Sequence, residues 1–207
     1  MLSWLNEHSG ALQVIMALVS ALIWLVYLQI FLLSYVRQRR PEMLISMGAG
    51  IGLDARCFIA NLGLEPIYIS QLLMRVSTED GEHEAATTDR QDMTEEQMKD
   101  PKNATNQGPL SSGKSFDAGS FRELTRQVLR ANSLDEDTPM VRLELTVVAM
   151  NASSAMLFAA RRRYDMIDVR GQQLLEPQTL STEQIRSIFQ RRRLRRQLRQ
   201  NLAKRRG

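Results

Sequence analysis

The sequence contains few of the residues that usually carry catalysis or covalent cross-links. Its 207 residues include one cysteine, Cys57, and two histidines, His8 and His83. One cysteine cannot form an intramolecular disulfide, and Cys57 lies in an apolar run that predicts a buried, unreactive thiol. No HExxH, paired CxxC or GxSxG motif occurs, no P-loop is expected, and Gly48-Ala49-Gly50-Ile51-Gly52 lacks the spacing of a phosphate-binding loop. We therefore expect a protein that is not an enzyme and that binds no metal and no cofactor.

Charged side chains are absent from residues 9–36. At a helical rise of ~1.5 Å per residue, this stretch is longer than the ~30 Å hydrocarbon core of a bilayer. A cleaved signal peptide would need a positive N-terminal region, whereas residues 1–8 carry Glu7 and no lysine or arginine. We expect a retained transmembrane helix over residues 11–36, preceded by an extracytoplasmic segment, residues 1–10.

Three arginines at the end of the apolar stretch indicate its orientation. Arg37, Arg39 and Arg40 flank one end of the expected span, and Glu7 flanks the other. By the positive-inside rule, the N-terminus lies outside and the chain from residue 41 onward lies in the cytoplasm. The expected location is the inner (plasma) membrane of a bacterium.

One side of the expected span carries small and polar residues. At 100° per residue these fall within about 120° of one another, and they are Gln13, Ala17, Ser20, Ala21, Trp24 and Tyr27. Such a stripe is typical of helices that pack against another helix, so we consider a homo-oligomer or pairing with another membrane protein. A single lipid-facing helix is the alternative, because Gln29 lies on the opposite side.

After Pro41 the apolar pattern changes from helical to strand-like. Short alternating runs are separated by glycine, asparagine and proline, and they predict strands near residues 42–47, 54–61, 67–78, 82–88, 140–151 and 155–167. No helix long enough for a parallel crossover separates most of them, which favours antiparallel pairing in a two-layer sandwich over residues 41–180. Asp80-Gly81 predicts a hairpin, and Ser120-Phe121-Arg122-Glu123 predicts a capped helix that ends near Ala131.

Residues 53–69 form a strand, an Asn-x-Gly turn, a proline and a second strand, reading Leu-Asp-Ala-Arg-Cys-Phe-Ile-Ala-Asn-Leu-Gly-Leu-Glu-Pro-Ile-Tyr-Ile. This pattern resembles that of immunoglobulin-like sandwiches in bacterial membrane-anchored proteins, and residues 108–113 resemble the loop before a late strand in such domains. Over residues 10–180 the chain is similar to uncharacterised proteobacterial proteins with one N-terminal span and a cytoplasmic domain. The resemblance implies an immunoglobulin-like β-sandwich, here with one inserted helix, and it brings no functional residues.

Two segments of opposite charge flank the late strands. Residues 79–100 contain nine acidic and two basic side chains, and residues 89–107 predict a mobile acidic loop. Residues 184–207 contain no acid and ten basic side chains, so the net charge of +4 would be about −6 without them. A capping-box pattern at Ser181 predicts a basic C-terminal helix over residues 181–207, with its charge concentrated at Arg191, Arg192, Arg193, Arg195, Arg196, Arg199, Lys204, Arg205 and Arg206.

These features favour a membrane-tethered cytoplasmic interaction or scaffold protein with an unknown protein partner. Its basic tail would contact anionic lipid headgroups, since each basic residue near an anionic leaflet contributes roughly 1 kcal/mol. The alternative is a membrane-attached nucleic-acid or ribosome-binding protein that uses the same tail, although Phe189 is the only aromatic residue there. Two other interpretations of the tail stay open: it only aids solubility, or it binds an acidic protein. An accessory role in a channel or transporter, suggested by the small-residue stripe, is a weaker hypothesis.

The orientation is directly testable. A reporter that folds and fluoresces in the cytoplasm, fused after residue 40, should be active, because the arginine flank keeps this end inside. A phosphatase that works only after export, fused at the same position, should be inactive. The opposite pair of results would contradict the topology.

Overall fold

The computed structural model describes residues 9–38, 41–87, 105–151, 156–170 and 172–187, together with residues 190, 192, 194 and 196. The chain divides into two compact units, Met1–Arg40 and Pro41–Gly207. The two units differ in both composition and architecture.

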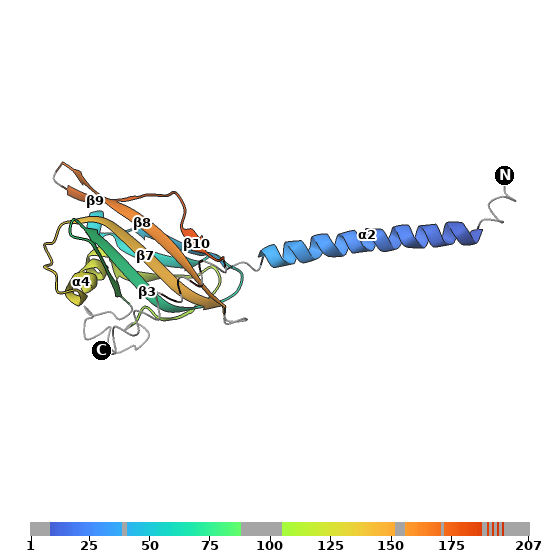
Figure 1. The fold of residues 1–207 in the computed structure, drawn as a ribbon, viewed down its shortest axis with the longest axis horizontal. Coiled ribbons are helices and arrows are strands. Elements are labelled where there is room, and N and C mark those ends of the chain that lie inside the picture. The colour runs from blue at the N-terminus through green and yellow to red at the C-terminus, as the bar shows by residue number, and fades with distance from the viewer. Residues whose placement is uncertain are drawn as a thin grey trace. The chain divides into compact units, whose positions relative to one another are not determined.

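The first unit is one long helix, α2 (Ser9–Gln38), followed along its length in Figure 1. Residues 10–35 are long and apolar enough to cross a membrane, and none of the side chains in this segment is buried inside the protein. A helix with apolar residues on all sides needs an apolar environment to cover it. Its length and composition agree with the helix expected over residues 11–36.

The second unit contains two antiparallel sheets. The smaller sheet has the order β1-β2-β6, with β1 (Met43–Gly48), β2 (Arg56–Asn61) and β6 (Ser115–Ser120). Between β1 and β2 the chain makes a short 3-10 turn, Gly52–Asp54, in which Gly52 has φ +58°. A Cβ atom there would meet the Gln173 carbonyl oxygen at 2.1 Å, so this turn requires glycine for both its backbone angle and its space.

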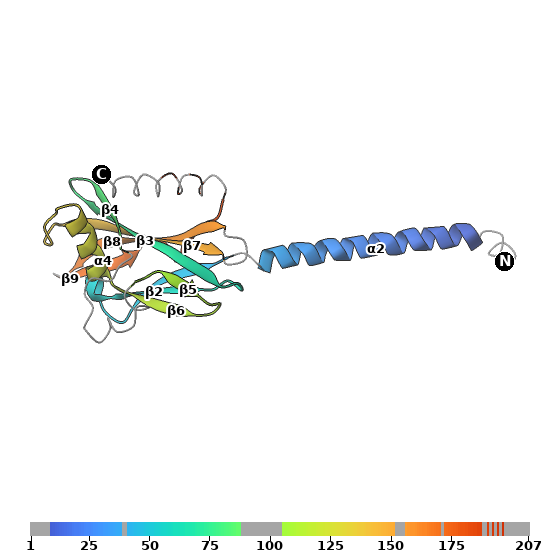
Figure 2. The ribbon, with the colours of Figure 1, turned by 90° about the horizontal axis from the view of Figure 1, so that it is seen from below.

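The larger sheet has the order β10-β8-β7-β3-β4. Its three long central strands are β3 (Ile67–Thr78), β7 (Met140–Asn151) and β8 (Leu157–Val169). Two short strands share each outer edge: β4 (Glu82–Ala86) and β5 (Gly108–Leu110) both pair with β3, while β9 (Gln172–Pro177) and β10 (Glu183–Ile185) both pair with β8. Figure 2 shows this sheet as one layer and β2 and β6 in the layer beside it.

The core fills the space between the two layers. Strand alternation points Ile45 of β1 and Ile59 of β2 inward, where they meet Leu72, Leu145 and Phe158 from the larger sheet. Fully burying each such side chain contributes about 1.5–3 kcal/mol.

Helix α4 (Phe121–Ala131) buries Phe121, Leu124 and Val128 in the same core, beside the β3–β4 hairpin in Figures 1 and 2. The capping box expected at Ser120 and Glu123 is present: the Ser120 hydroxyl accepts from the Glu123 backbone N–H, and the Glu123 carboxylate accepts from the Ser120 backbone N–H.

Side chains connect the two sheets at both sides. The outward N–H groups of Ile45 and Met43 on edge strand β1 donate to the Thr182 hydroxyl (3.0 Å) and the Gln184 side-chain carbonyl (3.3 Å). On the other side, the buried Asn106 amide donates to the carbonyl oxygens of Thr87 (3.3 Å) and Ala118 (3.2 Å). These bonds give partners to edge groups that would otherwise lose water without replacement.

The expected β-rich, antiparallel architecture is confirmed, with some changes in detail. The six expected strands match β1, β2, β3, β4, β7 and β8 within a few residues, and Asp80-Gly81 lies in the turn between β3 and β4. β5, β6, β9 and β10 were not expected. The expectation of a helix starting at Ser181 is wrong for its first turn, because residues 183–185 pair with β8 as β10. Long-range pairing and burial of Ile185 outweigh the local capping signal there.

The core assignment predicts unequal effects of two isoleucine substitutions. Ile59→Ala should lower the free energy of unfolding of the 41–207 fragment by about 2–5 kcal/mol, because Ile59 is fully buried. Ile51→Ala, in the exposed β1–β2 loop, should change it by less than about 0.5 kcal/mol. Urea denaturation followed by circular dichroism measures both. Equal losses would contradict this core.

Candidate functional site

The outer face of the larger sheet carries an ordered row of opposite charges across four strands. Its members are directly paired in the strand register, Arg75 with Glu84 and with Glu144, and Glu144 with Arg163. We call Glu84, Arg75, Glu144 and Arg163 the charge ladder. It exists because β4, β3, β7 and β8 each present alternate residues to this face, at positions that face one another.

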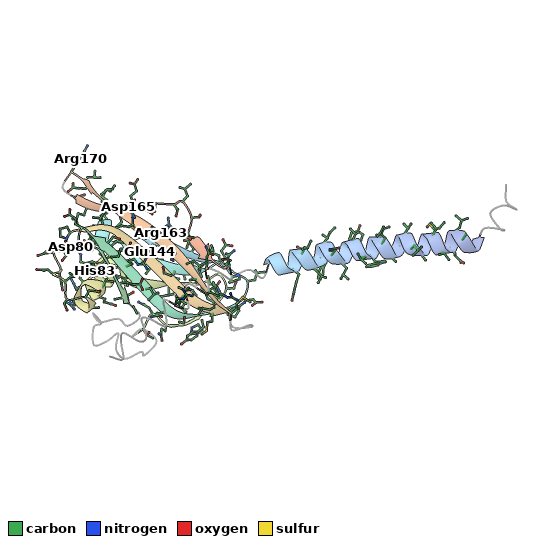
Figure 3. The ribbon with its side chains drawn as sticks, in the orientation of Figure 1. Asp80, His83, Glu144, Arg163, Asp165 and Arg170 are labelled. Atoms are coloured by element: carbon green, nitrogen blue, oxygen red, sulfur yellow. The ribbon has the colours of Figure 1, made fainter. Side chains whose placement is uncertain are left out.

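Glu144 is the centre of the charge ladder. Its carboxylate accepts from Arg163 Nε at 2.7 Å and lies 3.4 Å from Arg75 Nη1 and 3.6 Å from Arg161 Nε. Its side chain is only 10% exposed, so it has exchanged most of its hydration for three arginines. Figure 3 shows Glu144 and Arg163 labelled side by side on the sheet.

The ends of the charge ladder are also paired. Arg75 Nη2 lies 2.7 Å from Glu84 Oε2, and Arg163 Nη1 lies 3.5 Å from Glu183 Oε2 on β10. Burial by itself lowers the pKa of Arg75, but the hydrogen bond that it donates to Glu84 and the charges of Glu144, Glu84 and Glu82 raise the pKa above its ordinary value. Arg75 is therefore held between carboxylates on both sides, and the ion pairs fix the row in one geometry.

A second ion pair flanks the ladder toward the β8–β9 turn. Arg142 Nε donates to Asp165 Oδ1 at 2.9 Å, and the Gln178 amide donates to the same carboxylate. The Arg142 hydrogen bond, with a further contribution from Gln178, lowers the pKa of Asp165. This pair is about half exposed, so it contributes little to stability and presents charge to solvent.

The opposite end of the same face is apolar. Leu73, Val148 and Ala159 lie two to four residues from ladder positions on β3, β7 and β8, and they form a buried cluster with Ile185 and Leu194. The side chains of Ile185 and Leu194 come from the C-terminal segment. That segment therefore covers part of the outer face with apolar contacts, beside the charged part.

The inner face carries an unusual polar group of side chains. Cys57 is fully buried, as expected, and burial raises the pKa of its thiol to about 12. The Arg162 guanidinium lies 5.8 Å from the centroid of the Tyr164 ring, and burial raises the pKa of Tyr164. These groups remain in their neutral thiol and phenol forms, which does not favour nucleophilic chemistry.

A partly open hollow of about 370 Å³ lies between the 3-10 turn and β9. Its lining includes an exposed ion pair in which Arg122 Nε donates to Asp54 Oδ1 at 2.6 Å. That hydrogen bond lowers the pKa of Asp54, so the carboxylate is a weak base. The hollow is not suited to general acid–base catalysis by this group.

The expectation that no P-loop pattern occurs is wrong for the letters of the sequence, because residues 108–115, Gly-Pro-Leu-Ser-Ser-Gly-Lys-Ser, match GxxxxGK[ST]. The structural context that such a loop needs is a strand followed by a helix N-terminus. Here the residues join β5 to strand β6 instead. No helix begins at the motif, and the Gly113 and Lys114 N–H groups donate to the carbonyl oxygens of Asn61 (2.8 Å) and Ser111 (3.2 Å), so the motif forms a strand connection.

The residues expected from sequence to form sites are placed as follows. Gln13, Ala17, Ser20, Ala21 and Trp24 are all exposed along α2. Arg37 lies in the last turn of α2, while Arg39 and Arg40 lie outside the described residues. In the tail, Arg192 and Arg196 are helical and exposed, and the structure does not describe Arg191, Arg193, Arg195, Arg199, Lys204, Arg205 and Arg206.

Most of the acidic segment, residues 88–104, also lies outside the described residues, and its expected mobility stays a prediction. Asn106, near the end of the range expected to be mobile, is buried and hydrogen-bonded. Among the residues that are described, no group of three or more His, Cys, Asp or Glu side chains is arranged to hold a metal ion.

The charge ladder was not expected from the sequence, because the strands were predicted without a register. The available signal is period-two charge inside strands, as in Arg142 and Glu144, or Arg161, Arg163 and Asp165. Comparisons with family models, with curated proteins and with solved structures found no match.

The central position of Glu144 predicts that its charge matters for stability. Glu144→Gln keeps the shape but removes the negative charge from three arginines, and should lower the free energy of unfolding by about 2 kcal/mol. The control is Glu82→Gln, whose carboxylate is 66% exposed and 3.6 Å from Arg75, and which should cost less than about 0.5 kcal/mol. Similar urea midpoints for both variants would show that the ladder is only a surface feature.

Proposed function

We propose that this protein is a membrane-tethered interaction or scaffold protein. Two observations carry the proposal. A helix that is apolar enough to cross a membrane precedes a compact β domain by only a few residues, and one face of that domain holds arginines and carboxylates in a fixed row. A rigid surface with arginines and carboxylates in fixed positions can recognise a partner by charge complementarity. The partner proposed for this surface is another protein.

The location proposed is the bacterial inner membrane, with the domain in the cytoplasm. Support comes from the three arginines at the C-terminal end of α2 and the absence of basic residues before it. Cys57 fits a reducing compartment, because it is unpaired and buried.

The basic tail is proposed to contact anionic lipid. Leu194 is buried against the outer apolar cluster, while Arg192 and Arg196 on either side of it are exposed. This arrangement supports a tail that is attached to the domain through leucine and directs arginines toward solvent. An anionic leaflet would attract such a surface without sequence specificity.

Two further proposals concern the fold class and the span. The antiparallel pairing of two sheets around one core supports an immunoglobulin-like sandwich, with α4 as the insertion between β6 and β7. The exposed stripe of Gln13, Ala17, Ser20, Ala21 and Trp24 supports helix pairing within the membrane, either in a homo-oligomer or with another membrane protein.

The alternative function is membrane-attached nucleic-acid or ribosome binding through the tail. Arginine-rich helices bind phosphate backbones in a salt-dependent manner. The exposed arginines suit a nucleic-acid phosphate backbone as well as a lipid headgroup. The experiment must therefore distinguish nucleic-acid binding from lipid binding.

The lipid contact is tested with the 41–207 fragment and vesicles that contain phosphatidylglycerol. Deleting residues 184–207 would remove part of β10 and the buried Ile185 and Leu194, so the test variant keeps the backbone and those side chains. It replaces the charged residues with glutamine at Arg191, Arg192, Arg193, Arg195, Arg196, Arg199, Lys204, Arg205 and Arg206. Since each charge contributes roughly 1 kcal/mol near an anionic surface, co-sedimentation should be lost.

The matched control replaces the eight arginines in that set with lysine and should bind vesicles almost as well as the unmodified fragment, because it keeps the charge. Unchanged sedimentation of the glutamine variant would refute the lipid contact. Tight binding of single-stranded RNA by the fragment, stronger than vesicle binding and lost in the glutamine variant, would favour the alternative.

A further inference from the structure

The loop between β2 and β3 exposes two leucines at one end of the domain. Leu62 and Leu64 are 54% and 63% exposed, whereas Gly63 between them is buried. Exposing two large apolar side chains from one short turn forgoes the stabilisation that their burial would give. Such a feature is typical of a surface that contacts something apolar.

The loop is held in this shape by a buried side chain. The Asn61 amide nitrogen donates to the carbonyl oxygens of Glu65 (2.9 Å) and Leu110 (3.1 Å), and its amide oxygen accepts from the Gly63 N–H (3.0 Å). Asn61 is fully buried. The two leucines are thus projected by a preformed turn, so little ordering entropy is lost when they bind.

The same loop lies against the first residues that follow the apolar helix in the chain. The backbone N–H groups of Leu62 and Gly63 donate to the Glu42 carbonyl oxygen at 2.8 and 3.1 Å. A Cβ at Gly63 would meet Pro41 Cα at 3.4 Å. Glu42 follows Gln38, the last residue of α2, by four residues, which reach at most ~14 Å of chain.

Other amphipathic side chains share this end of the domain. Tyr68 is 43% exposed and pairs with Pro109, and Met156 is 45% exposed next to Asn151, at the end of the β7–β8 pair. Lys114 is exposed in the loop between β5 and β6, whose Ser112 hydroxyl donates to the Gly63 carbonyl oxygen at 2.7 Å. Leucine, methionine and tyrosine beside a lysine is the composition of segments that lie in a membrane interface.

We propose that loop 62–64 inserts Leu62 and Leu64 into the headgroup and acyl boundary of the bilayer that α2 crosses. The proposal rests on the proposed membrane span, and it adds a second, apolar contact that is independent of the basic tail. The covalent tether keeps the loop at high effective concentration near the bilayer, so two leucines suffice for a lasting contact. The domain would then stand with this end on the membrane and α4, at the opposite end of β2, away from it.

The chain provides a matched control at the opposite end of the same hairpin. Ile51 is 69% exposed in the loop between β1 and β2, and the six-residue strands place it ~20 Å from loop 62–64. Cys57 is fully buried with a raised pKa, so it should not react with a maleimide at neutral pH in the folded protein. The unmodified chain therefore serves as the unlabelled reference.

The experiment uses the full chain reconstituted in phosphatidylcholine vesicles, which removes the electrostatic contribution of the tail. Variants Leu64→Cys, Leu62→Cys and Ile51→Cys each receive an environment-sensitive nitrobenzoxadiazole label. We expect a blue-shifted emission for the labels at Leu62 and Leu64, and several-fold stronger quenching by spin-labelled lipid than for the label at Ile51. Two leucine positions are labelled so that the result does not depend on one variant.

The outcomes separate this inference from the proposed span. If the protein fails to float with the vesicles, the membrane span is wrong, and the inference falls with it. If the protein floats but all three labels show the emission of water-exposed dye, the span stands and the loop insertion is refuted. Equal quenching at Ile51 and Leu64 would also overturn it, because the domain would then lie without a preferred end on the membrane.

Discussion

The alternation of side chains along β3, β7 and β8, interrupted in β3 by a register shift between Ile69 and Gln71, is the constraint on which the rest of the domain depends. Each of these strands is long enough to serve two surfaces, and adjacent residues belong to different ones. Leu145 enters the core, whereas its neighbour Glu144 receives three arginines on the other face. A slip of one residue in register would bury Glu144 among apolar groups and expose Leu145, so the two faces fix the same register.

The two faces of the larger sheet are stabilised in different ways. The inner face is covered by the smaller sheet and α4, and its stability comes from apolar burial. The outer face is covered only in part, by Ile185 and Leu194. On the rest of this face, arginines and glutamates pair with one another. Partial cover explains why the C-terminal segment cannot be a detached tail throughout: its first residues complete the sheet as β10, and Leu194 completes the outer cluster. The C-terminal segment that was predicted to be a basic helix from Ser181 onward therefore begins inside the folded domain.

Local patterns in the sequence predicted the elements whose determinants are local. The capping box at Ser120, the Asp80-Gly81 turn and the buried strand around Cys57 each depend on residues a few positions apart, and all three are present. β10 depends on a partner strand more than twenty residues away, so the local helix signal at Ser181 was misleading. The charge ladder needs the register of four strands, which no single segment contains. The letters GxxxxGKS are likewise not enough to predict a phosphate-binding loop. Such a loop requires a helix directly after it, and here strand β6 follows.

The two proposed membrane contacts differ in physical character, and the difference decides what each can do. Attraction between arginines and an anionic leaflet acts over a Debye length of ~8 Å at physiological salt and weakens as salt is added. Insertion of Leu62 and Leu64 acts only on contact, is insensitive to salt, and is possible only when one end of the domain meets the bilayer. The tail can therefore draw the domain toward the surface before any contact is made. The rigid turn fixed by Asn61 can set which end of the domain is held at the bilayer, and a domain held by one end presents the charge ladder at a constant height and angle to a partner that moves in or along the same membrane.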